Sequence, residues 1–250
     1  MLLEFPGTRG EIEEESEKHR YHSSIVVNEG DTSILIDFGE KHPPYLRDRI
    51  NDFNALLITH AHPDHYIWTL REEKEVKIPV YLTEVTLNYG QNKPVNYHVI
   101  VPEESFELGS INVVAYEVIH SLRCPAVCYK LKGSKVLVYA PDIVDIGSEG
   151  DEEKSDRKRK VFENVDILIA DGSSLDVNMV RRKDNKLFGH ARIKTIVGWC
   201  KKYRIGSLII THCGKQLVTI DEKELQKKLY EYAEGKVDIR VAYDGYIEEI

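Results

Sequence analysis

Short runs of aliphatic and β-branched residues recur along the chain, and each is bounded by Gly, Asp, Asn or Pro. Such runs between turn-forming residues are typical of β-strands. They predict strands over residues 24–27, 33–37, 55–59, 80–83, 112–120, 135–142, 166–171, 207–212 and 238–242.

Two longer stretches, 191–203 and 221–233, have the pattern of helices. Asp221 is a good N-cap with Glu224 three residues on, and Gly235 suits the position after a helix end. Strands joined by short turns dominate the first half of the chain, whereas helical connections lengthen in the second half. This favours an α/β fold in which helices cover two sheets, rather than one doubly wound parallel sheet.

Composition narrows the class of protein. The chain has 250 residues, of which 42% are hydrophobic and 30% charged, enough for one substantial core. Neither an internal repeat nor a low-complexity linker divides it, so we expect a single domain over residues 1–250. The net charge of -8 disfavours a protein that coats nucleic acid through overall positive potential, but it leaves a local basic groove open.

The cysteines and the N-terminus carry no targeting or cross-linking signal. The four cysteines, at positions 124, 128, 200 and 213, lack the paired Cys-x-x-Cys spacing of a structural zinc site, so we expect free buried thiols. No basic region precedes a long apolar segment, and nowhere do about 18 apolar residues run together. We therefore expect a soluble, cytoplasmic protein with no membrane partner.

A dense cluster of ligand-type side chains follows the predicted strand 55–59. It consists of His60, His62, Asp64 and His65. A buried strand cannot hold three imidazoles and a carboxylate without partners, so these side chains must emerge at its end. His60 and His62 share a side of an extended backbone, whereas Asp64 and His65 face differently. The spacing therefore predicts ligands for two separate metal ions.

Three further predicted strands also end in a ligand-type residue. These residues are His120, Asp142 and His212. A single His at a strand end is more often a capping or surface residue. If all four strand ends converge at one edge, however, they supply five His and two Asp ligands without sulfur. Such a set suits Zn²⁺ first, with Mn or Fe as alternatives.

The segment 59–65, Thr-His-Ala-His-Pro-Asp-His, resembles the His-x-His-x-Asp-His signature of the metallo-β-lactamase superfamily. Other segments are similar to the branch that contains ribonuclease Z and the cyclic phosphodiesterases. They are Gly-Thr-Arg-Gly at 7–10, Ser-Ser at 23–24, Ile-Leu-Ile-Asp-Phe-Gly at 34–39, Gly-His at 189–190 and Ile-Thr-His at 210–212. The resemblance implies a four-layer αββα sandwich of the metallo-β-lactamase type.

The resemblance also implies a ligand set. His60, His62 and His120 would hold the first ion, Asp64, His65 and His212 the second, and Asp142 would bridge them. Asp37, after an earlier strand, would orient a ligand, with a simple turn carboxylate as the alternative. Asp171 would line the site or cap the turn that follows it.

Asp64 and His190 are the candidate catalytic residues. His190 follows Gly189 and opens the predicted helix 191–203, where backbone N–H groups and the helix dipole favour an anion. A surface His at a helix start is the plain alternative, but the resemblance favours phosphate contact or protonation of a leaving oxygen.

Two basic runs, 157–160 and 181–183, are candidates for phosphate contacts, although charge runs are more often solvated faces. The first belongs to the polar segment 147–160, which we expect to be an exposed connection with a short helix.

Two divalent ions about 4 Å apart would lower the pKa of a bridging water, giving hydroxide at neutral pH. No Gly-x-Ser-x-Gly, Walker A or Gly-x-Gly-x-x-Gly motif indicates other chemistry. We predict a dinuclear metal-dependent hydrolase that uses this metal-bridging hydroxide, a phosphodiesterase or nuclease acting on RNA, DNA or a cyclic phosphate. The alternatives are hydrolysis of a lactone, thioester or other small ester, and a family member that binds a metabolite or partner with little turnover.

The acidic net charge and the lack of a long Gly/Pro-rich arm disfavour a dedicated ribonuclease Z. A homodimer is compatible with the resemblance, although no feature of the chain demonstrates one.

Overall fold

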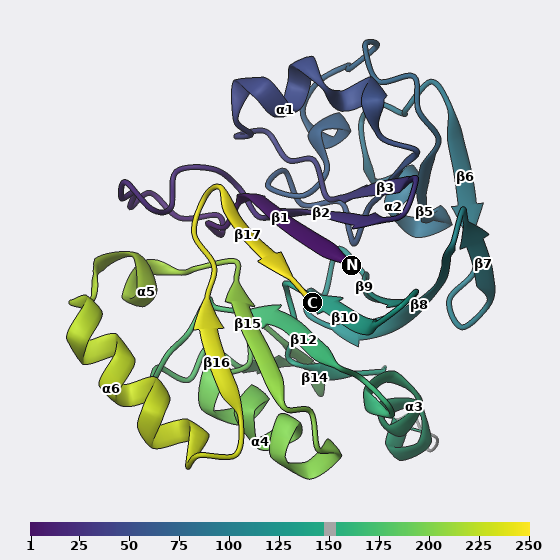
Figure 1. Ribbon diagram of the computed structural model, residues 1–250. Helices are drawn as coiled ribbons and strands as arrows, with labels where there is room; N and C mark the ends of the chain where they lie inside the picture. Colours follow the sequence, from purple (N-terminus) through teal and green to yellow (C-terminus); the bar gives the residue numbers. More distant parts are fainter. Residues whose placement is uncertain (148–153) are drawn as a thin grey trace.

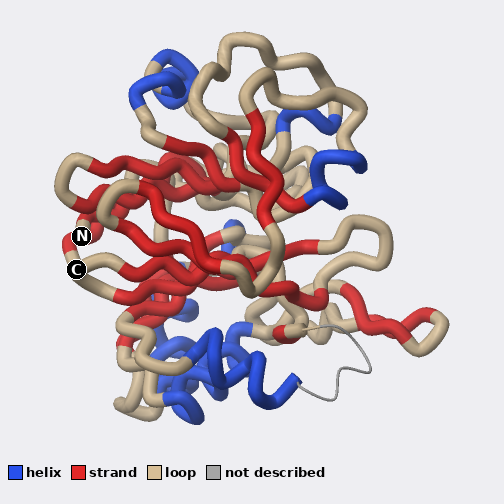
Figure 2. The backbone as a smooth tube through the Cα atoms, turned by 90° about the vertical axis from the view of Figure 1, so that its right-hand side faces the viewer, coloured by secondary structure: helices blue, strands red, loops and turns tan. Residues whose placement is uncertain are grey.

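Two large β-sheets pack face to face in the middle of the molecule (Figure 1). Figure 2 shows the helices gathered on the outer sides of these sheets, above and below the strands. The computed structural model describes residues 1–147 and 154–250. The arrangement is the four-layer αββα sandwich that the sequence predicted.

The first sheet has the strand order β17-β1-β2-β3-β4-β5-β6. Its strands are β1 (Leu2–Gly7), β2 (Ser24–Glu29), β3 (Thr32–Ile36), β4 (Ala55–Leu57), β5 (Val80–Thr83), β6 (Tyr97–Ile100) and β17 (Tyr246–Glu249). Strands β3 to β6 run parallel to one another, so their carboxyl ends meet at one edge of the sheet.

The second sheet has the order β11-β8-β9-β10-β12-β15-β16, and β7 pairs with β8. Its strands are β7 (Ser105–Leu108), β8 (Ile111–Ile119), β9 (Ala126–Lys132), β10 (Val136–Ala140), β11 (Asp145–Ile146), β12 (Ile167–Asp171), β15 (Ser207–Thr211) and β16 (Asp238–Val241). Strands β10, β12, β15 and β16 are parallel, so this sheet too has an edge of aligned carboxyl ends. A separate two-stranded hairpin consists of β13 (Arg181–Lys183) and β14 (Lys186–Phe188).

Helices cover the two outer faces. The first sheet is covered by α1 (Pro44–Asp48), the 3₁₀ turns η1 (Ile50–Asp52) and η2 (Ile67–Thr69), and α2 (Glu84–Tyr89). The second is covered by α3 (Lys154–Phe162), α4 (Ile193–Tyr203), α5 (Lys215–Thr219) and α6 (Glu222–Ala233). The Asp221 side chain caps α6 as predicted, because it accepts the N–H groups of Lys223 and Glu224.

Alternation along the strands separates the apolar residues into layers. In β3, Ile34 and Ile36 join the core between the sheets, whereas Leu35 packs under the helices of the first sheet. In β12, Ile169 faces the inter-sheet core and Leu168 faces α4 and its neighbours. Because helices cover the outer faces, both sides of these strands are buried, which explains their continuous apolar runs.

The predicted strands and helices correspond to elements of the structure, with ends shifted by a few residues. The sequence did not predict β1, β6, β7, β9, β11, β13, β14 or β17. The four cysteines are free and buried, as expected. Helix α3 begins within the polar segment 147–160, for which a short helix was predicted, and extends two residues beyond it. Residues 148–153 of this segment lie outside the described ones. Among the helices that the structure describes, all are too short or too polar to span a membrane.

Candidate metal centre

The side chains predicted as metal ligands lie together at the edge where strands of both sheets end. The loop after β4 carries His60, His62, Asp64 and His65, while His120 follows β8, Asp142 follows β10 and His212 follows β15. All but His62 are buried. The recurrence of ligand-type residues at separate strand ends thus reflects a single site.

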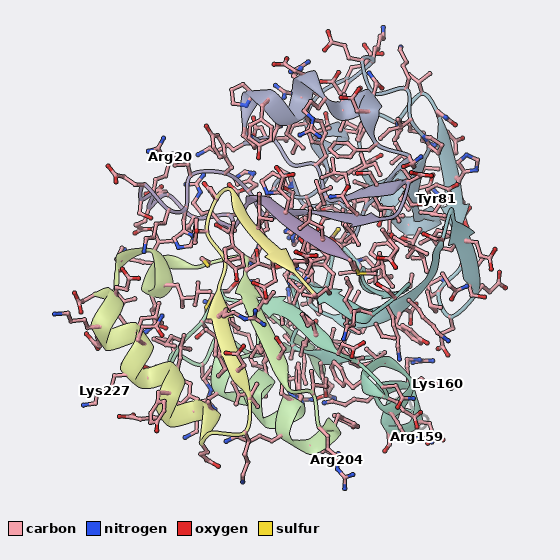
Figure 3. The ribbon with its side chains drawn as sticks, in the orientation of Figure 1. Arg20, Tyr81, Arg159, Lys160, Arg204 and Lys227 are labelled. Carbon is pink, nitrogen blue, oxygen red and sulfur yellow. The ribbon has the colours of Figure 1, made fainter. Side chains whose placement is uncertain are left out.

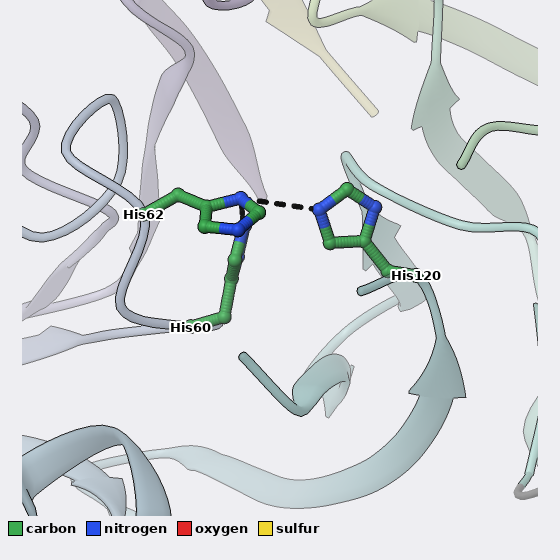
Figure 4. Close-up of side chains that lie close together, drawn as sticks. All are labelled: His60, His62 and His120. Atoms are coloured by element: carbon green, nitrogen blue, oxygen red, sulfur yellow. Dashed lines mark hydrogen bonds between the residues drawn. The ribbon is translucent and has the colours of Figure 1, made fainter. Parts of the chain in front are cut away.

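The first group of nitrogen atoms belongs to three imidazoles. Nδ1 of His62 lies 2.9 Å from Nε2 of His60 and 3.2 Å from Nε2 of His120 (Figure 4). One ring nitrogen of each residue lies within 4.8 Å of the other two. Three imidazole nitrogens directed at one point are the arrangement by which a divalent cation is held.

The second group combines one carboxylate with two imidazoles. Oδ2 of Asp64 lies 3.1 Å from Nε2 of His65 and 3.1 Å from Nε2 of His212. One donor atom of each of these three residues lies within 4.8 Å of the other two. Their donor atoms are nitrogen and oxygen, so the group suits the same cations as the first.

Asp142 lies between the two groups. Its Oδ2 is 2.8 Å from Nε2 of His65 and 3.3 Å from Nε2 of His212, whereas its Oδ1 is 3.6 Å from Nε2 of His120. One carboxylate therefore reaches both groups with different oxygen atoms.

Two buried atoms at this point test whether the site fits a metal ion. His65 Nε2 and Asp142 Oδ2 are both buried and have no hydrogen-bond partner of acceptable geometry. Unpartnered buried polar atoms are costly in a native protein, and a shared cation would satisfy both. The seven donors include no thiolate, so they fit zinc, manganese or iron.

Asp37 supports His65 from behind. It lies directly after β3, is fully buried, and its Oδ2 accepts a hydrogen bond from Nδ1 of His65 at 2.8 Å. The Thr59 N–H donates to Oδ1 of the same carboxylate at 2.8 Å. With Nδ1 protonated, Nε2 of His65 is left with its lone pair directed at the centre.

Three other imidazoles are oriented in the same way. Nδ1 of His60 lies 3.0 Å from Oγ1 of Thr59, Nδ1 of His120 lies 3.1 Å from the Gly189 carbonyl oxygen, and Nδ1 of His212 lies 2.9 Å from Oγ of Ser173. Each contact leaves Nε2 toward the centre. Sequence reasoning missed Thr59, Ser173 and the Gly189 carbonyl in this role.

Close backbone approaches shape the site at two glycines. A Cβ on Gly10 would lie 2.9 Å from the His212 ring, and a Cβ on Gly39 would lie 1.9 Å from the Asp64 carbonyl oxygen. His212 itself has a φ of 51°, a left-handed conformation that non-glycine residues seldom adopt. The tight packing around these residues holds this backbone in place.

Burial and charge set the protonation of the first group. Burial lowers the pKa of His120 to about 4, and it also lowers the pKa values of His60 and His62. These imidazoles are therefore neutral at neutral pH, as metal ligation requires.

Opposite charges set the protonation of the second group. Burial alone would raise the pKa of Asp64 and of Asp142, but neighbouring imidazoles hold both well below the usual range. Burial alone would lower the pKa of His212, but Asp142 and other carboxylates raise it to about 10. The carboxylates are thus ionised, and a bound cation would replace the positive charge that the imidazoles now supply.

His190 lies beside the ligands but is held by a different residue. Its Nδ1 is 2.8 Å from Oδ2 of Asp171 and 3.4 Å from Oδ1 of Asp142. Burial lowers the pKa of His190, but the Asp171 carboxylate outweighs this effect and raises it. Asp171 also accepts the backbone N–H groups of Ile143 and Ser173, so it lines the site and orients His190.

The predicted helix 191–203 begins two residues later than expected, so the placement of His190 at a helix start was wrong. Helix α4 begins at Ile193, with Arg192 as its N-cap. The Ala191 N–H donates instead to the Ile143 carbonyl at 2.7 Å, which keeps this segment out of the helix. His190 is therefore oriented by Asp171 and not by a helix dipole.

A cavity of about 510 Å³ opens over the candidate ligands. His62, Asp64, His120, Asp142, His190 and His212 contribute to its floor and walls. Apolar side chains of Ile12, Val177 and Met179 line it as well, and Glu11 and Lys215 lie at its wall. The cavity can therefore hold a small ester or one end of a larger substrate.

The cationic side chains of the basic run at 157–160 form ion pairs within the protein. Arg157 and Lys160 pair with Glu103, and Lys158 pairs with Asp145. No residue of this run lines the cavity.

Comparisons with known proteins agree with this architecture. The chain matches the beta-lactamase superfamily domain over residues 32–213, which is more than half of its length. Together with the nitrogen and oxygen ligand groups, this match defines the class: the chain belongs to the metallo-β-lactamase superfamily of hydrolases.

One relative is ribonuclease Z of Methanopyrus kandleri, 27% identical over 149 residues, a match that covers 54% of this chain and 52% of the relative. The chain thus spans about half the length of this relative.

Two solved structures show the same fold. The metallo-beta-lactamase fold protein YhfI from Bacillus subtilis superimposes with a TM-score of 0.69 at 17% identity, covering 100% of this chain and 98% of that one. The short form of human tRNase Z superimposes with a TM-score of 0.66 at 17% identity, covering 100% and 99%. At these identities the likeness concerns the fold alone.

Proposed function

We propose that this protein is a dinuclear metal-dependent phosphodiesterase or nuclease. The observation that carries the proposal is His190 on the wall of the cavity, beside the candidate ligands and held from behind by the buried Asp171. An imidazole oriented by a buried carboxylate next to a metal centre suits a reaction with a poor oxygen leaving group, such as phosphodiester hydrolysis.

The ligand assignment follows the two groups of donor atoms. His60, His62 and His120 would hold one ion, Asp64, His65 and His212 the other, and Asp142 both. We propose zinc as the metal. When bound, two divalent ions lower the pKa of water and stabilise negative charge on phosphoryl oxygens. Asp64, the other candidate catalytic residue, would act by holding the second ion beside the reacting group.

His190 would supply the proton for the leaving group. Asp171 accepts the Nδ1–H of His190, so Nε2 is the atom left to donate a proton to the departing oxygen. The buried carboxylate fixes the ring orientation and stabilises the imidazolium form, as the Asp of a catalytic triad does for its His.

The similarity to ribonuclease Z of Methanopyrus kandleri supports a phosphodiester substrate. The apolar wall of the cavity, at Val177 and Met179, favours hydrolysis of a lactone or other small ester as the second candidate.

A substrate panel separates these activities. Bound metal is first quantified by mass spectrometry, and the metal-loaded protein is assayed on bis(p-nitrophenyl) phosphate, short RNA and DNA, cyclic nucleotides, and lactones. We expect two divalent ions per chain and hydrolysis of phosphodiesters. Hydrolysis of lactones alone would replace our proposal with the second candidate. Loaded protein that hydrolyses no substrate would indicate a binding function.

A further inference from the structure

One face of the β13–β14 hairpin concentrates positive charge. Arg181 pairs with Phe188 and Lys183 pairs with Lys186 across the hairpin. Residues directly opposite one another, and residues two apart on one strand, share a face of the ladder. The face therefore carries three cationic side chains and, at its base, one aromatic ring.

Among the residues that the structure describes, no carboxylate forms an ion pair with Arg181, Lys183 or Lys186, and all three are exposed. Like charges directly opposite each other, as at Lys183 and Lys186, destabilise a strand pair. The cations of the basic run of α3, by contrast, each form an ion pair, with Glu103, Asp145 or Asp156. In a chain of net charge -8, an unneutralised cationic face beside a candidate metal centre is a place where an anionic ligand can bind.

The base of the hairpin is tied to the candidate metal centre. The Gly189 N–H donates to the His120 carbonyl at 2.7 Å, and the Gly189 carbonyl contacts Nδ1 of His120 at 3.1 Å. Gly189 has a φ of 110°, and a Cβ there would lie 2.2 Å from the Met179 carbonyl oxygen. The chain enters the hairpin from Met179 and leaves it into His190, both of which line the cavity. The cationic face therefore begins at the rim of the cavity.

The hairpin has a defined shape and reach. Its turn residues, Asp184 and Asn185, have φ values of 48° and 61°, which are those of a tight type I′ turn. Three residues of antiparallel strand span about 10 Å. Figure 2 shows the hairpin projecting from the body of the molecule. At ~3.4 Å of rise per nucleotide, a strand length of about 10 Å corresponds to about three nucleotides.

We propose that the face of Arg181, Lys183, Lys186 and Phe188 binds the backbone of a single nucleic-acid strand whose scissile phosphate lies at the metal centre. This inference rests on the proposed phosphodiesterase function and specifies its substrate as a polynucleotide, because only a strand of several nucleotides contacts cations along the full length of the hairpin. Cationic side chains contact phosphates whatever the nucleotide sequence. The Phe188 ring, at the end of the hairpin that joins the body of the molecule, can stack on a nucleobase. Glu11, elsewhere on the cavity wall, repels the same polyanion.

Binding of a nuclease-resistant strand tests the proposal without turnover. A fluorescein-labelled phosphorothioate 12-mer is titrated by anisotropy into the metal-loaded protein at several salt concentrations. The test variant combines Arg181→Gln, Lys183→Gln and Lys186→Gln. The control combines Arg204→Gln, Lys223→Gln and Lys227→Gln, which removes the same charges from exposed positions elsewhere. Arg204 and Lys227 extend into solvent from α4 and α6 (Figure 3).

We expect the hairpin variant to bind the 12-mer at least tenfold more weakly than wild type, and the control variant within twofold of wild type. Losing three phosphate contacts should reduce the slope of log K against log salt by about 2. Equal losses in both variants, or no loss in the hairpin variant, would overturn the proposal. Equal competition by a 12-residue polyglutamate would also overturn it, since the face would then bind any polyanion.

Kinetic measurements distinguish a failure of the hairpin proposal from a failure of the proposed phosphodiesterase function. For the hairpin variant, the ratio of kcat/KM on the RNA 12-mer to kcat/KM on bis(p-nitrophenyl) phosphate should fall at least tenfold. If wild type binds the strand through the hairpin but hydrolyses no phosphodiester, the proposed function fails and the nucleic-acid surface stands. If wild type hydrolyses phosphodiesters and the ratio is unchanged, the hairpin proposal fails alone.

Discussion

Asp37 accepts a hydrogen bond from Nδ1 of His65 at 2.8 Å, although the two residues lie 28 positions apart in the chain. Both side chains are fully buried. The contact joins the end of β3 to the ligand loop that follows β4, because these strands are parallel neighbours. It decides which nitrogen of His65 is available to a cation.

Asp37→Asn should weaken the binding of the second ion by about 10- to 100-fold, the usual effect of losing such a supporting carboxylate. The amide is of similar size, so the fold should be retained. Zinc affinity is measured by competition with a chelator of known affinity. The control is Asp31→Asn, which removes an exposed carboxylate. Unchanged affinity in the Asp37 variant would contradict the role assigned to this contact.

Asp142→Ala and His190→Ala should separate ligation from proton transfer. Asp142 contacts both ligand groups, so its loss should remove metal and activity together. His190 is held by Asp171, so its loss should leave the metal content unchanged and lower kcat on a phosphodiester by about 10²- to 10⁴-fold. Metal content and kcat are measured on the same samples. A metal-free His190→Ala protein would show that His190 is itself a ligand.

His19 should make the apoprotein sensitive to mild acid. Its Nδ1 lies 2.8 Å from Oγ1 of Thr8, which donates to Asp244, and burial lowers the pKa of His19 to about 4. In the unfolded chain this pKa is about 6.5, so the unfolded state binds more protons between these values. The contribution of neutral His19 to the free energy of unfolding is therefore fully present above pH 6.5. It is lost as the pH falls toward 4, by up to about 3 kcal/mol.

Urea unfolding of the chelator-treated protein between pH 7.5 and 4.5 measures this loss. His19→Gln removes the titrating group, so its free energy of unfolding should depend less on pH over this interval. His98→Gln, at an exposed position, should keep the dependence of wild type. Parallel pH profiles for wild type and His19→Gln would mean that His19 is not the responsible group.

Local patterns were sufficient for the central part of the fold. Strands such as β12 and β15 are buried on both faces, so their apolar runs are visible in any short window of sequence. The terminal strands β1 and β17 were missed because their pairing joins opposite ends of the chain. In β17 the apolar Ile247 is exposed while Glu248 is half-buried, which further obscures its alternation.

The candidate site was predictable where its chemistry depends on unusual residues. His and Asp at successive strand ends stand out because each would be costly to bury alone. The contacts from Thr59 and Ser173 were not predictable, because hydroxyl residues are common and their partners lie on other segments. The role of His190 was expected, but its orientation by Asp171 depends on the pairing of β10 with β12 and on the extended segment before α4.

Two hydrogen bonds join Gly189 to His120 at the end of the β13–β14 hairpin. They separate a part of the chain whose sequence is constrained by the centre from a part whose sequence and length can vary. Gly189 and His190 are fixed by contacts to the centre, whereas the tip residues Asp184 and Asn185 form a tight turn in which the Arg182 side chain donates to the Asn185 carbonyl. Residues can therefore be inserted or exchanged at the tip without moving a candidate ligand. The hairpin is a place where substrate preference can diverge among related enzymes, or be redesigned, while the hydrolytic chemistry stays the same.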